Sequence, residues 1–147
     1  MKIYNKKVSW LLVILWMGVI FFFSAMPDTD SSQSSLAAVN IVLGILSALQ
    51  ITADIGLLHL MIRKIAHGTE YFILCTLCIN AFRSSGFSLQ LSLLYGFFLS
   101  IGYAATDEFH QLFVPGRTGT LTDVLIDSIG GGIGTLIYWT ITKTRRK

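Results

Sequence analysis

The chain has 147 residues, of which 53% are hydrophobic and 13% are charged, and its formal net charge is +3. A soluble domain carries about a quarter charged residues, so the composition excludes an ordinary soluble protein and indicates a single-domain integral membrane protein. The basic residues lie towards the chain ends without a nucleic-acid motif, so we expect no nucleic-acid partner. Two cysteines, Cys75 and Cys78, are too few for a disulfide framework, and we expect them to pack in the core.

Four apolar segments are each long enough to cross a bilayer as a helix, which takes about 20 residues at 1.5 Å per residue. The predicted spans are residues 8–25, 62–82, 88–109 and 121–142, within one domain of residues 1–147. A signal peptide also has a basic start, but its apolar region is usually about 7–15 residues long. We therefore predict that the first span is retained and that Pro27 ends it.

Residues 32–52 form a fifth uncharged segment, in which Val39, Leu43 and Leu46 fall on one helical face and Asn40 and Ser47 on another. Such amphipathicity suits a helix that lies at the membrane surface. A fifth crossing would also carry the basic C-terminal tail out of the cell, whereas Lys and Arg collect on the cytoplasmic side. We predict an interfacial helix here, between the first and second spans.

With four spans, both termini are predicted to be cytoplasmic. Eight of the eleven basic residues then lie on the inner side: Lys2, Lys6, Lys7, Arg83, Lys143, Arg145, Arg146 and Lys147. All eight acidic residues lie on or near the outer side: Asp28, Asp30, Asp54, Glu70, Asp107, Glu108, Asp123 and Asp127. The polar ends of spans two, three and four therefore meet in the outer leaflet.

The third span ends in the run Asp107-Glu108-Phe109-His110-Gln111. Ionisable groups near the hydrocarbon are costly and are often functional. In the second span, Arg63, His67 and Glu70 are spaced i, i+4, i+7 and share one face of a helix. We expect these two polar faces to form one site.

The fourth span contributes Asp123 and Asp127, which share a helical face with Gly130 and Gly134. Glycines four residues apart allow two membrane helices to approach closely. The face that carries the two aspartates is therefore predicted to pack inside the bundle.

The predicted site is unbalanced in charge. Its members are three bases and five acids: Arg63, Lys64, Arg117, Glu70, Asp107, Glu108, Asp123 and Asp127. One interpretation is an ion-pair network that only pins the helices together. However, two uncompensated negative charges are costly in a low-dielectric site. Shared protons, protonated histidines or a bound cation could supply the missing positive charge.

Two pairs, His67-x-x-Glu70 and Asp107-x-x-His110, each place a histidine one turn from a carboxylate. This spacing can hold a metal ion from a helix, so a divalent metal is a possible cofactor with these four residues as ligands. The same pairs can act as a general acid and base without any metal. The spacing alone does not decide between the two.

Several motifs follow one another in a fixed order: Phe23-Ser24-x-x-Pro27, Arg63-Lys64-x-x-His67-x-x-Glu70-Tyr71, Asp107-Glu108-x-x-Gln111, Arg117 and Asp123-x-x-x-Asp127. In this ordered set the chain resembles the VanZ family of small bacterial membrane proteins, from the first span to the last. The family is named for a member associated with resistance to teicoplanin, a lipoglycopeptide antibiotic. One departure is Gly68, where the resemblance leads us to expect a bulkier residue, often Phe.

The resemblance implies a protein of the bacterial cytoplasmic membrane with a role in the cell envelope. We predict an all-α bundle of four membrane helices that lowers susceptibility to lipoglycopeptides such as teicoplanin through a polar site at the outer leaflet. One alternative is a membrane enzyme that acts on a lipid-linked or peptidoglycan-precursor substrate. Another is a non-catalytic protein that binds a lipid or serves as a scaffold, held by the ion-pair network. Whether the protein is an enzyme and which oligomer it forms are left open.

The candidate catalytic residues are Glu70, Asp107, His110 and Asp127. The candidate binding residues are Ser24, Arg63, Lys64, His67, Tyr71, Glu108, Gln111, Arg117 and Asp123. The expected partner is a membrane lipid, a lipid-linked cell-wall precursor or a lipoglycopeptide.

Overall fold

The computed structural model describes residues 5–26, 39–52 and 54–144, and these residues form helices without any strand. Four helices are long and apolar enough to cross a membrane: α1 (Lys6–Ser24), α3 (Ile55–Ser84), α4 (Leu89–Gln111) and α5 (Leu121–Thr144). The predicted all-α bundle with four spans is thus confirmed, and the chain is a multi-pass membrane protein.

The helix α3 is longer than the span predicted for it, because it begins at Ile55 rather than at residue 62. A side chain at the start of the helix explains this difference. The Asp54 carboxylate accepts a hydrogen bond of 2.9 Å from the backbone N–H of Leu57, which caps the first turn. Asn5 caps α1 and Ser88 caps α4 in the same way. Local capping therefore extends the helix beyond the apolar segment.

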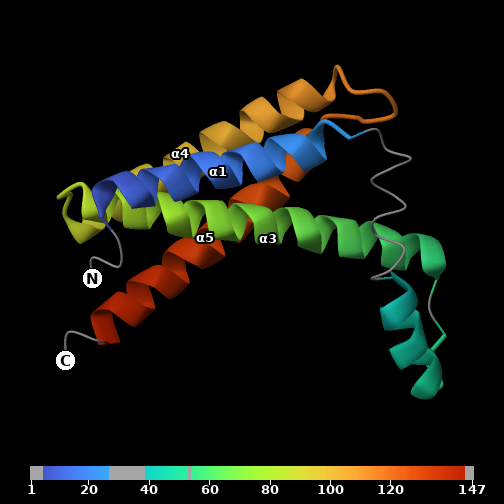
Figure 1. The fold of residues 1–147 in the computed structure, drawn as a ribbon. Helices are drawn as coiled ribbons and strands as arrows, with labels where there is room; N and C mark the ends of the chain where they lie inside the picture. Colours follow the sequence, from blue (N-terminus) through green and yellow to red (C-terminus); the bar gives the residue numbers. More distant parts are fainter. Residues whose placement is uncertain (1–4, 27–38, 53, 145–147) are drawn as a thin grey trace.

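Between α1 and α3 the described residues include a short apolar helix, Val39–Ala48. At 1.5 Å per residue it rises only about 15 Å, too short to cross a bilayer. It lies across the N-terminal end of α3 and away from the four-helix bundle (Figure 1). An extra helix between the first two spans is confirmed over these ten residues.

Some predictions fall on residues outside those that the structure describes. These are the start of the interfacial helix before Val39, the break at Pro27, and the charges of Lys2, Asp28, Asp30, Arg145, Arg146 and Lys147.

The helix α3 is the centre of the bundle, since it packs against α1, α4 and α5 (Figure 1). Close approach to α5 depends on glycine. A Cβ atom at Gly130 would collide with the backbone carbonyl oxygen of Gly68, and one at Gly134 would lie 2.9 Å from that of Phe72. On the glycine face predicted for α5, Asp127, Gly130 and Gly134 are buried, whereas Asp123, also predicted on this face, is 20% exposed at its edge.

A second set of small residues, which the sequence analysis did not identify, lines α4. Ser92, Gly96, Ser100 and Ala104 recur every four residues and are all buried. A Cβ at Gly96 would lie 2.8 Å from the backbone nitrogen of Ile79 on α3. Small side chains therefore bring α3 and α4 together as well, as is common between membrane helices.

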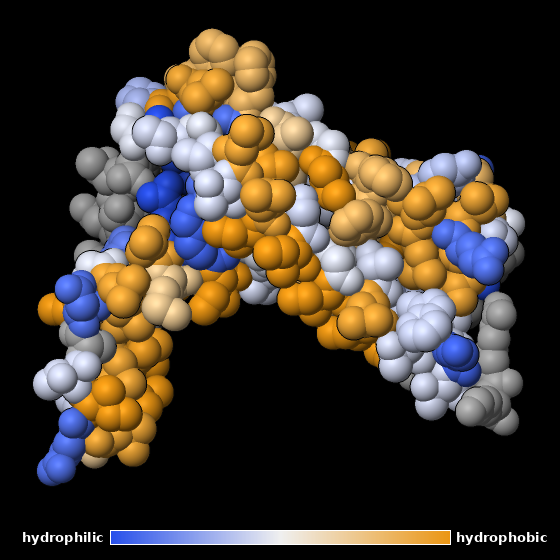
Figure 2. Space-filling model, turned by 180° about the vertical axis from the view of Figure 1, so that it is seen from behind, coloured by the Kyte–Doolittle hydropathy of each residue, from blue (hydrophilic) through white to orange (hydrophobic). Residues whose placement is uncertain are grey.

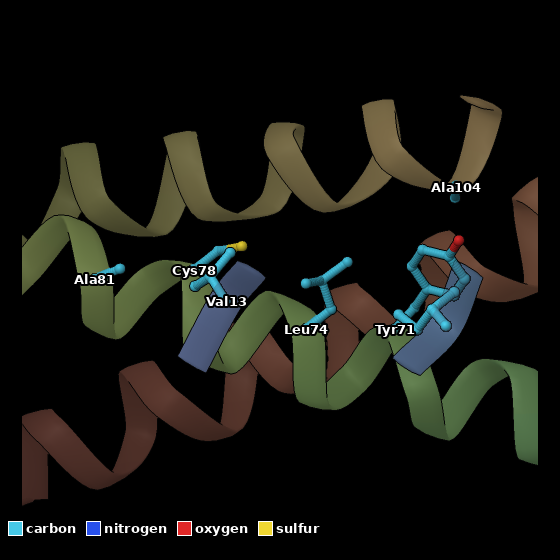
Figure 3. Close-up of a cluster of buried hydrophobic side chains, with 7 residues drawn as sticks. Val13, Tyr71, Leu74, Cys78, Ala81 and Ala104 are labelled. Carbon is cyan, nitrogen blue, oxygen red and sulfur yellow. The ribbon is translucent and has the colours of Figure 1, made fainter. Parts of the chain in front are cut away.

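Large apolar side chains cover the outside of the bundle, and Figure 2 shows broad hydrophobic surface on one face. The interior is small by comparison. Its main cluster contains Val13, Ile20, Tyr71, Leu74, Cys78, Ala81 and Ala104. In Figure 3 these side chains follow α3 along its length, and the Tyr71 hydroxyl points towards α4. Both cysteines are free and buried, consistent with the packing role predicted for them.

Candidate functional site

The C-terminal ends of α1 and α4 meet the N-terminal halves of α3 and α5 at one end of the bundle. Every acidic residue that the structure describes belongs to this end: Asp54, Glu70, Asp107, Glu108, Asp123 and Asp127. We call it the acidic end. The opposite end, which carries Lys6, Lys7, Arg83 and Lys143, is called the basic end.

Two aspartates form the centre of the acidic end. The exposed fraction is 3% for Asp107 on α4 and 1% for Asp127 on α5, so both lie out of reach of solvent. Gln111 Nε2 donates a hydrogen bond of 3.3 Å to Asp107 Oδ2. Asp107 Oδ1 and both carboxylate oxygens of Asp127 are buried without a hydrogen-bond partner in the protein. Leaving a buried polar atom unpaired costs about 1–3 kcal/mol, and more for a charged group.

Hydroxyl groups from two other helices complete this centre. The hydroxyls of Ser24 on α1 and Tyr71 on α3 lie beside the Asp107 carboxylate, although neither reaches full hydrogen-bond geometry. Tyr71 is fully buried. Four predicted site residues from four helices, namely Ser24, Tyr71, Asp107 and Asp127, are therefore brought together, and we call them the central cluster.

Glu70 and His67 lie at the edge of the central cluster. The Glu70 carboxylate is close enough to Asp107 and Arg117 to interact with their charges. His67 Nδ1 lies 4.0 Å from Glu70 Oε2 on the next turn of α3, too far for a hydrogen bond. The Trp16 indole N–H donates 3.0 Å to the backbone carbonyl of Glu70, which fixes α1 against α3 at this depth.

Glu108 is held by the start of α5. Its Oε2 accepts a 2.8 Å hydrogen bond from the backbone N–H of Thr120, while Oε1 has no hydrogen-bond partner. The adjoining Gly119 packs so closely that an added Cβ would collide with the Glu108 carbonyl oxygen. This carboxylate therefore joins the end of α4 to the beginning of α5.

Lys64 and Asp123 form an ion pair between α3 and α5. The side chains are 30% and 20% exposed respectively, so this pair lies at the edge of the site rather than inside it. The charge of each residue is neutralised largely by the other.

Arg117 connects the loop before α5 to α1. Its Nε donates 3.0 Å to the carbonyl of Met26, and an Nη donates 2.9 Å to the carbonyl of Phe23. The carbonyls at a helix C-terminus lack partners within the helix, so this guanidinium stabilises the end of α1. At least part of its hydrogen-bonding capacity is used within the protein.

The remaining predicted residues are peripheral. The His110 ring packs on Phe21 with a centroid distance of 4.7 Å, and its Nδ1 is buried without a hydrogen-bond partner. Arg63 is half-buried one residue before Lys64. The structure therefore gathers the predicted site residues at one end of the bundle. His110 lies at the edge of the central cluster, close enough to Asp107 to interact with its charge, while Arg63 makes none of the contacts described for the cluster.

The proposed metal ligands are not arranged around a common point. Within residues 5–26, 39–52 and 54–144, no three His, Cys, Asp or Glu side chains are grouped so that they could hold a metal ion. His67, Glu70, Asp107 and His110 lie at the same end of the bundle without forming such a group.

The sequence analysis missed Thr120, which both caps α5 and binds Glu108. Its Oγ1 accepts 3.2 Å from the backbone N–H of Asp123. The pattern Thr120-x-x-Asp123 at the start of an apolar run is typical of a helix N-terminus and would have identified this residue. Nothing in the sequence indicates that the backbone carbonyls of Phe23 and Met26 accept hydrogen bonds from Arg117.

The geometry limits which chemistry the central cluster can perform. Ionised carboxylates only accept hydrogen bonds, so a group that satisfies Asp107 and Asp127 must donate a hydrogen bond, as a hydroxyl or an amide N–H does, or carry positive charge, as a cation does. A pair of carboxylates beside a phenol can also exchange protons as a general acid and base. An ion-pair network that only holds the helices together, as predicted, accounts for Glu108, Lys64, Asp123 and Arg117. It does not account for the unpaired oxygens of the central cluster.

Comparison with known proteins agrees with the resemblance seen in the motifs. The family model VanZ/LLP1 matches residues 9–142, nearly the whole chain. No curated protein and no solved structure matches the chain significantly. Since the match covers α3 and α4, most of α1 and α5, and every residue of the site, the chain belongs to the VanZ/LLP1 family.

Proposed function

We propose that the protein acts in the bacterial cell envelope through the central cluster and lowers the susceptibility of the cell to lipoglycopeptides such as teicoplanin. The observation that carries this proposal is the burial of both Asp127 oxygens without a partner, next to Asp107. A folded protein gains no stability from such a group, because a buried polar group without a hydrogen-bond partner is destabilising. In a membrane protein, ionisable residues of this kind usually serve a function.

The proposed site faces the outer leaflet. The basic end holds Lys6, Lys7, Arg83 and Lys143, and cytoplasmic flanks collect such residues. A reporter fused after Lys147 is expected to be cytoplasmic, and one inserted between Pro27 and Asp54 is expected to be external. If the C-terminus were external, the acidic end would lie at the cytoplasmic side of the membrane, away from the surface at which lipoglycopeptides act.

The ligand of the central cluster is proposed to be a hydrogen-bond donor. Peptidoglycan precursors carry sugar hydroxyls and peptide N–H groups, and these would satisfy the unpaired oxygens of Asp107 and Asp127 once the helices at the acidic end move apart to admit them, since both carboxylates are buried. If the protein is an enzyme, the two carboxylates and the Tyr71 hydroxyl would move protons on such a lipid-linked precursor. If it only binds, the same contacts would hold the precursor without turnover.

The test is to express the protein in a susceptible bacterial host and to measure teicoplanin susceptibility together with membrane abundance in the same cells. Asp127→Asn and Asp107→Asn keep the side-chain shape and remove the charge. We expect both variants to accumulate normally and to lose protection.

The matched control is Asp54→Asn, because Asp54 caps α3 at an exposed position and touches no residue of the central cluster. It is expected to retain protection. If protection follows abundance in all three variants, the carboxylates serve only to hold the helices together. If the wild type gives no protection although it accumulates, the link to lipoglycopeptides is wrong.

A further inference from the structure

Two hollows adjoin each other on the outside of the bundle, where α4 runs beside the C-terminal half of α5. The first lies at the basic end and has a volume of about 400 Å³. It is lined by Arg83, Ser88, Leu89, Gln90, Leu93 and Trp139. The second also has a volume of about 400 Å³ and is lined by Gln90, Leu93, Leu94, Phe97, Gly132 and Thr135. Because Gln90 and Leu93 line both hollows, the two form one groove, which we call the basic-end groove.

The basic-end groove is polar at its outer end and mostly apolar deeper along α4. Arg83 and Gln90 lie at the polar end, whereas Leu94 and Phe97 line the deeper part. A Cβ at Gly132 would meet only the Phe97 ring, at 3.9 Å, so the missing side chain leaves the deeper part open. From Gln90 to Phe97 the helix rises about 10 Å, roughly two thirds of one leaflet of the hydrocarbon core. A phospholipid has the same order of polarity, a charged headgroup followed by an acyl chain.

The polar end of the groove carries positive charge without an acidic neighbour among the described residues. Every described Asp and Glu lies at the acidic end, and residues 71–106 and 128–147 contain neither. Arg83 Nη1 donates 2.8 Å to the carbonyl of Phe87, which uses one of the five donors of the guanidinium and leaves its charge in place. Lys143 Nζ lies 4.7 Å from the centroid of the Trp139 ring, so a second cation lies against the lining. The charge therefore favours a negatively charged occupant at this end.

The start of α4 adds hydrogen-bond donors to this charge. The first backbone N–H groups of a helix lack partners within it. Ser88 Oγ accepts a hydrogen bond from the N–H of Leu91. The N–H groups of Leu89 and Gln90, which both line the groove, have no acceptor within the part of the chain that the structure describes. Phosphate oxygens accept such bonds, and the helix dipole favours their negative charge.

We propose that the basic-end groove binds an anionic phospholipid, with its phosphate between Arg83 and the start of α4 and one acyl chain beside Phe97. Basic pockets between membrane helices bind anionic headgroups in this way. Free phosphate would occupy only the polar end, so the apolar part of the groove favours a lipid. The groove lies at the opposite end of the bundle from the central cluster and does not depend on the function proposed for that cluster.

The experiment uses the full-length protein in phosphatidylcholine vesicles that contain a small fraction of a photoactivatable lipid. The probe is phosphatidylglycerol with a diazirine in the middle of one acyl chain, and the comparison probe is the matching phosphatidylcholine. Cross-linked peptides are identified by mass spectrometry. We expect phosphatidylglycerol to label residues 93–97 and 132–135 about twentyfold more than phosphatidylcholine does, as two basic residues near a membrane surface would produce.

Residues 8–13 of α1 provide an internal control in the same sample. They adjoin Lys6 and Lys7, which are exposed at the same end of the bundle. Labelling there reports the general attraction of lysines for anionic lipid, and we expect its preference for phosphatidylglycerol to be several times smaller, because exposed charges are screened by salt. An equal preference at both places would overturn the proposal, since the groove would then add nothing to the surface charge.

Arg83→Gln should lower the preference in the groove from about twentyfold to about fivefold, the value for one remaining cation. The matched control is Lys7→Gln, which removes a charge from the same end but from outside the lining. It should leave the preference in the groove unchanged. If Arg83→Gln does not accumulate, Lys143→Gln removes the second cation from an exposed position and should have the same effect. An unchanged preference in the accumulating variant would overturn the assignment of the phosphate.

Gly132→Leu should fill the deeper part of the groove and remove most of the labelling by both probes. Its control is Gly102→Leu, because Gly102 is exposed on α4 and nothing lies within 4 Å of its Cβ. Undiminished labelling in folded Gly132→Leu would show that the acyl chain lies elsewhere. An excess of inorganic phosphate at constant ionic strength separates lipid from free anion. The preference for phosphatidylglycerol should persist, and its loss would make free phosphate the occupant.

Discussion

The two ends of the bundle both bury polar residues, but they satisfy them differently. At the basic end, Ser9 and Ser84 share a hydrogen bond of 3.1 Å, and Asn80 Nδ2 donates 3.2 Å to Ser9 Oγ. The Trp10 indole N–H donates 3.0 Å to Ser85 Oγ. These groups are neutral, and together they join α1 to the end of α3.

At the acidic end the buried groups are carboxylates, and several of their oxygens have no partner in the protein. Asp127 is the extreme case, with both oxygens unpaired. A network of neutral hydrogen bonds makes a small net contribution to the free energy of folding, whereas burying a charge without a partner is unfavourable. Asn80 Oδ1 and Arg83 Nε at the basic end are also buried without a partner. The difference is that the polar side chains of the basic end join α1 to α3 through hydrogen bonds, whereas the Asp127 carboxylate at the acidic end makes none within the protein.

The largest effect on stability is expected from Gly130→Ala, which would push apart α3 and α5 beneath the central cluster. The new Cβ collides with the backbone carbonyl of Gly68, which cannot move without shifting the helix. We expect a loss of about 3 kcal/mol or more, at the upper end of the range for overpacked cores, measured by unfolding in detergent. Gly132→Ala is the control, because its Cβ would lie 3.9 Å from the Phe97 ring. Equal stability of both variants would show that the helices are not in close contact at Gly130.

Arg117→Lys is expected to cost about 1.5–3 kcal/mol, the range for hydrogen bonds to charged groups. Lysine cannot reproduce the two parallel donors that contact the carbonyls of Phe23 and Met26. Thermal unfolding would measure the loss, and cross-linking of cysteines placed in α1 and the loop before α5 would locate it. If stability is unchanged while protection falls, Arg117 acts on a ligand and not on α1.

At the basic end, Asn80→Ala removes the donor to Ser9. We expect a loss of about 1 kcal/mol in the free energy of unfolding. Protection per molecule should stay the same, since no residue of the central cluster contacts Asn80. A variant that accumulates fully but no longer protects would contradict the separation of the two ends.

The smallest effect is expected from the exposed ion pair. Lys64→Gln and Asp123→Asn should each change stability by less than about 1 kcal/mol, because partly exposed pairs contribute little. The double variant gives the coupling energy between the two side chains. A coupling of several kcal/mol would place this pair among the structural elements of the acidic end.

Much of the fold could be predicted from the sequence, because membrane helices are defined by length and apolarity. The buried face of α5, with Asp127 and Gly130, followed from helical periodicity alone. The true start of α3 did not, since the Asp54 cap and not hydropathy extends that helix. The four-residue repeat of small residues in α4 was visible in the sequence but was not used.

The structure gathers the predicted site residues at one end of the bundle, but their roles depend on contacts between distant parts of the chain. Arg117 binds carbonyls 91 and 94 residues away, and Glu108 binds a backbone N–H in the next helix. Helical spacing carries no information on such contacts. Only the structure shows which partner each of these side chains binds.

The most direct test of the central claim is the melting temperature of Asp127→Asn, measured beside its protection in cells. If the buried carboxylate serves function rather than stability, its removal should leave the melting temperature unchanged or raise it, while protection is lost. A melting temperature several degrees lower, with protection reduced only in proportion to abundance, would contradict the claim and make the acidic end a structural element like the basic one.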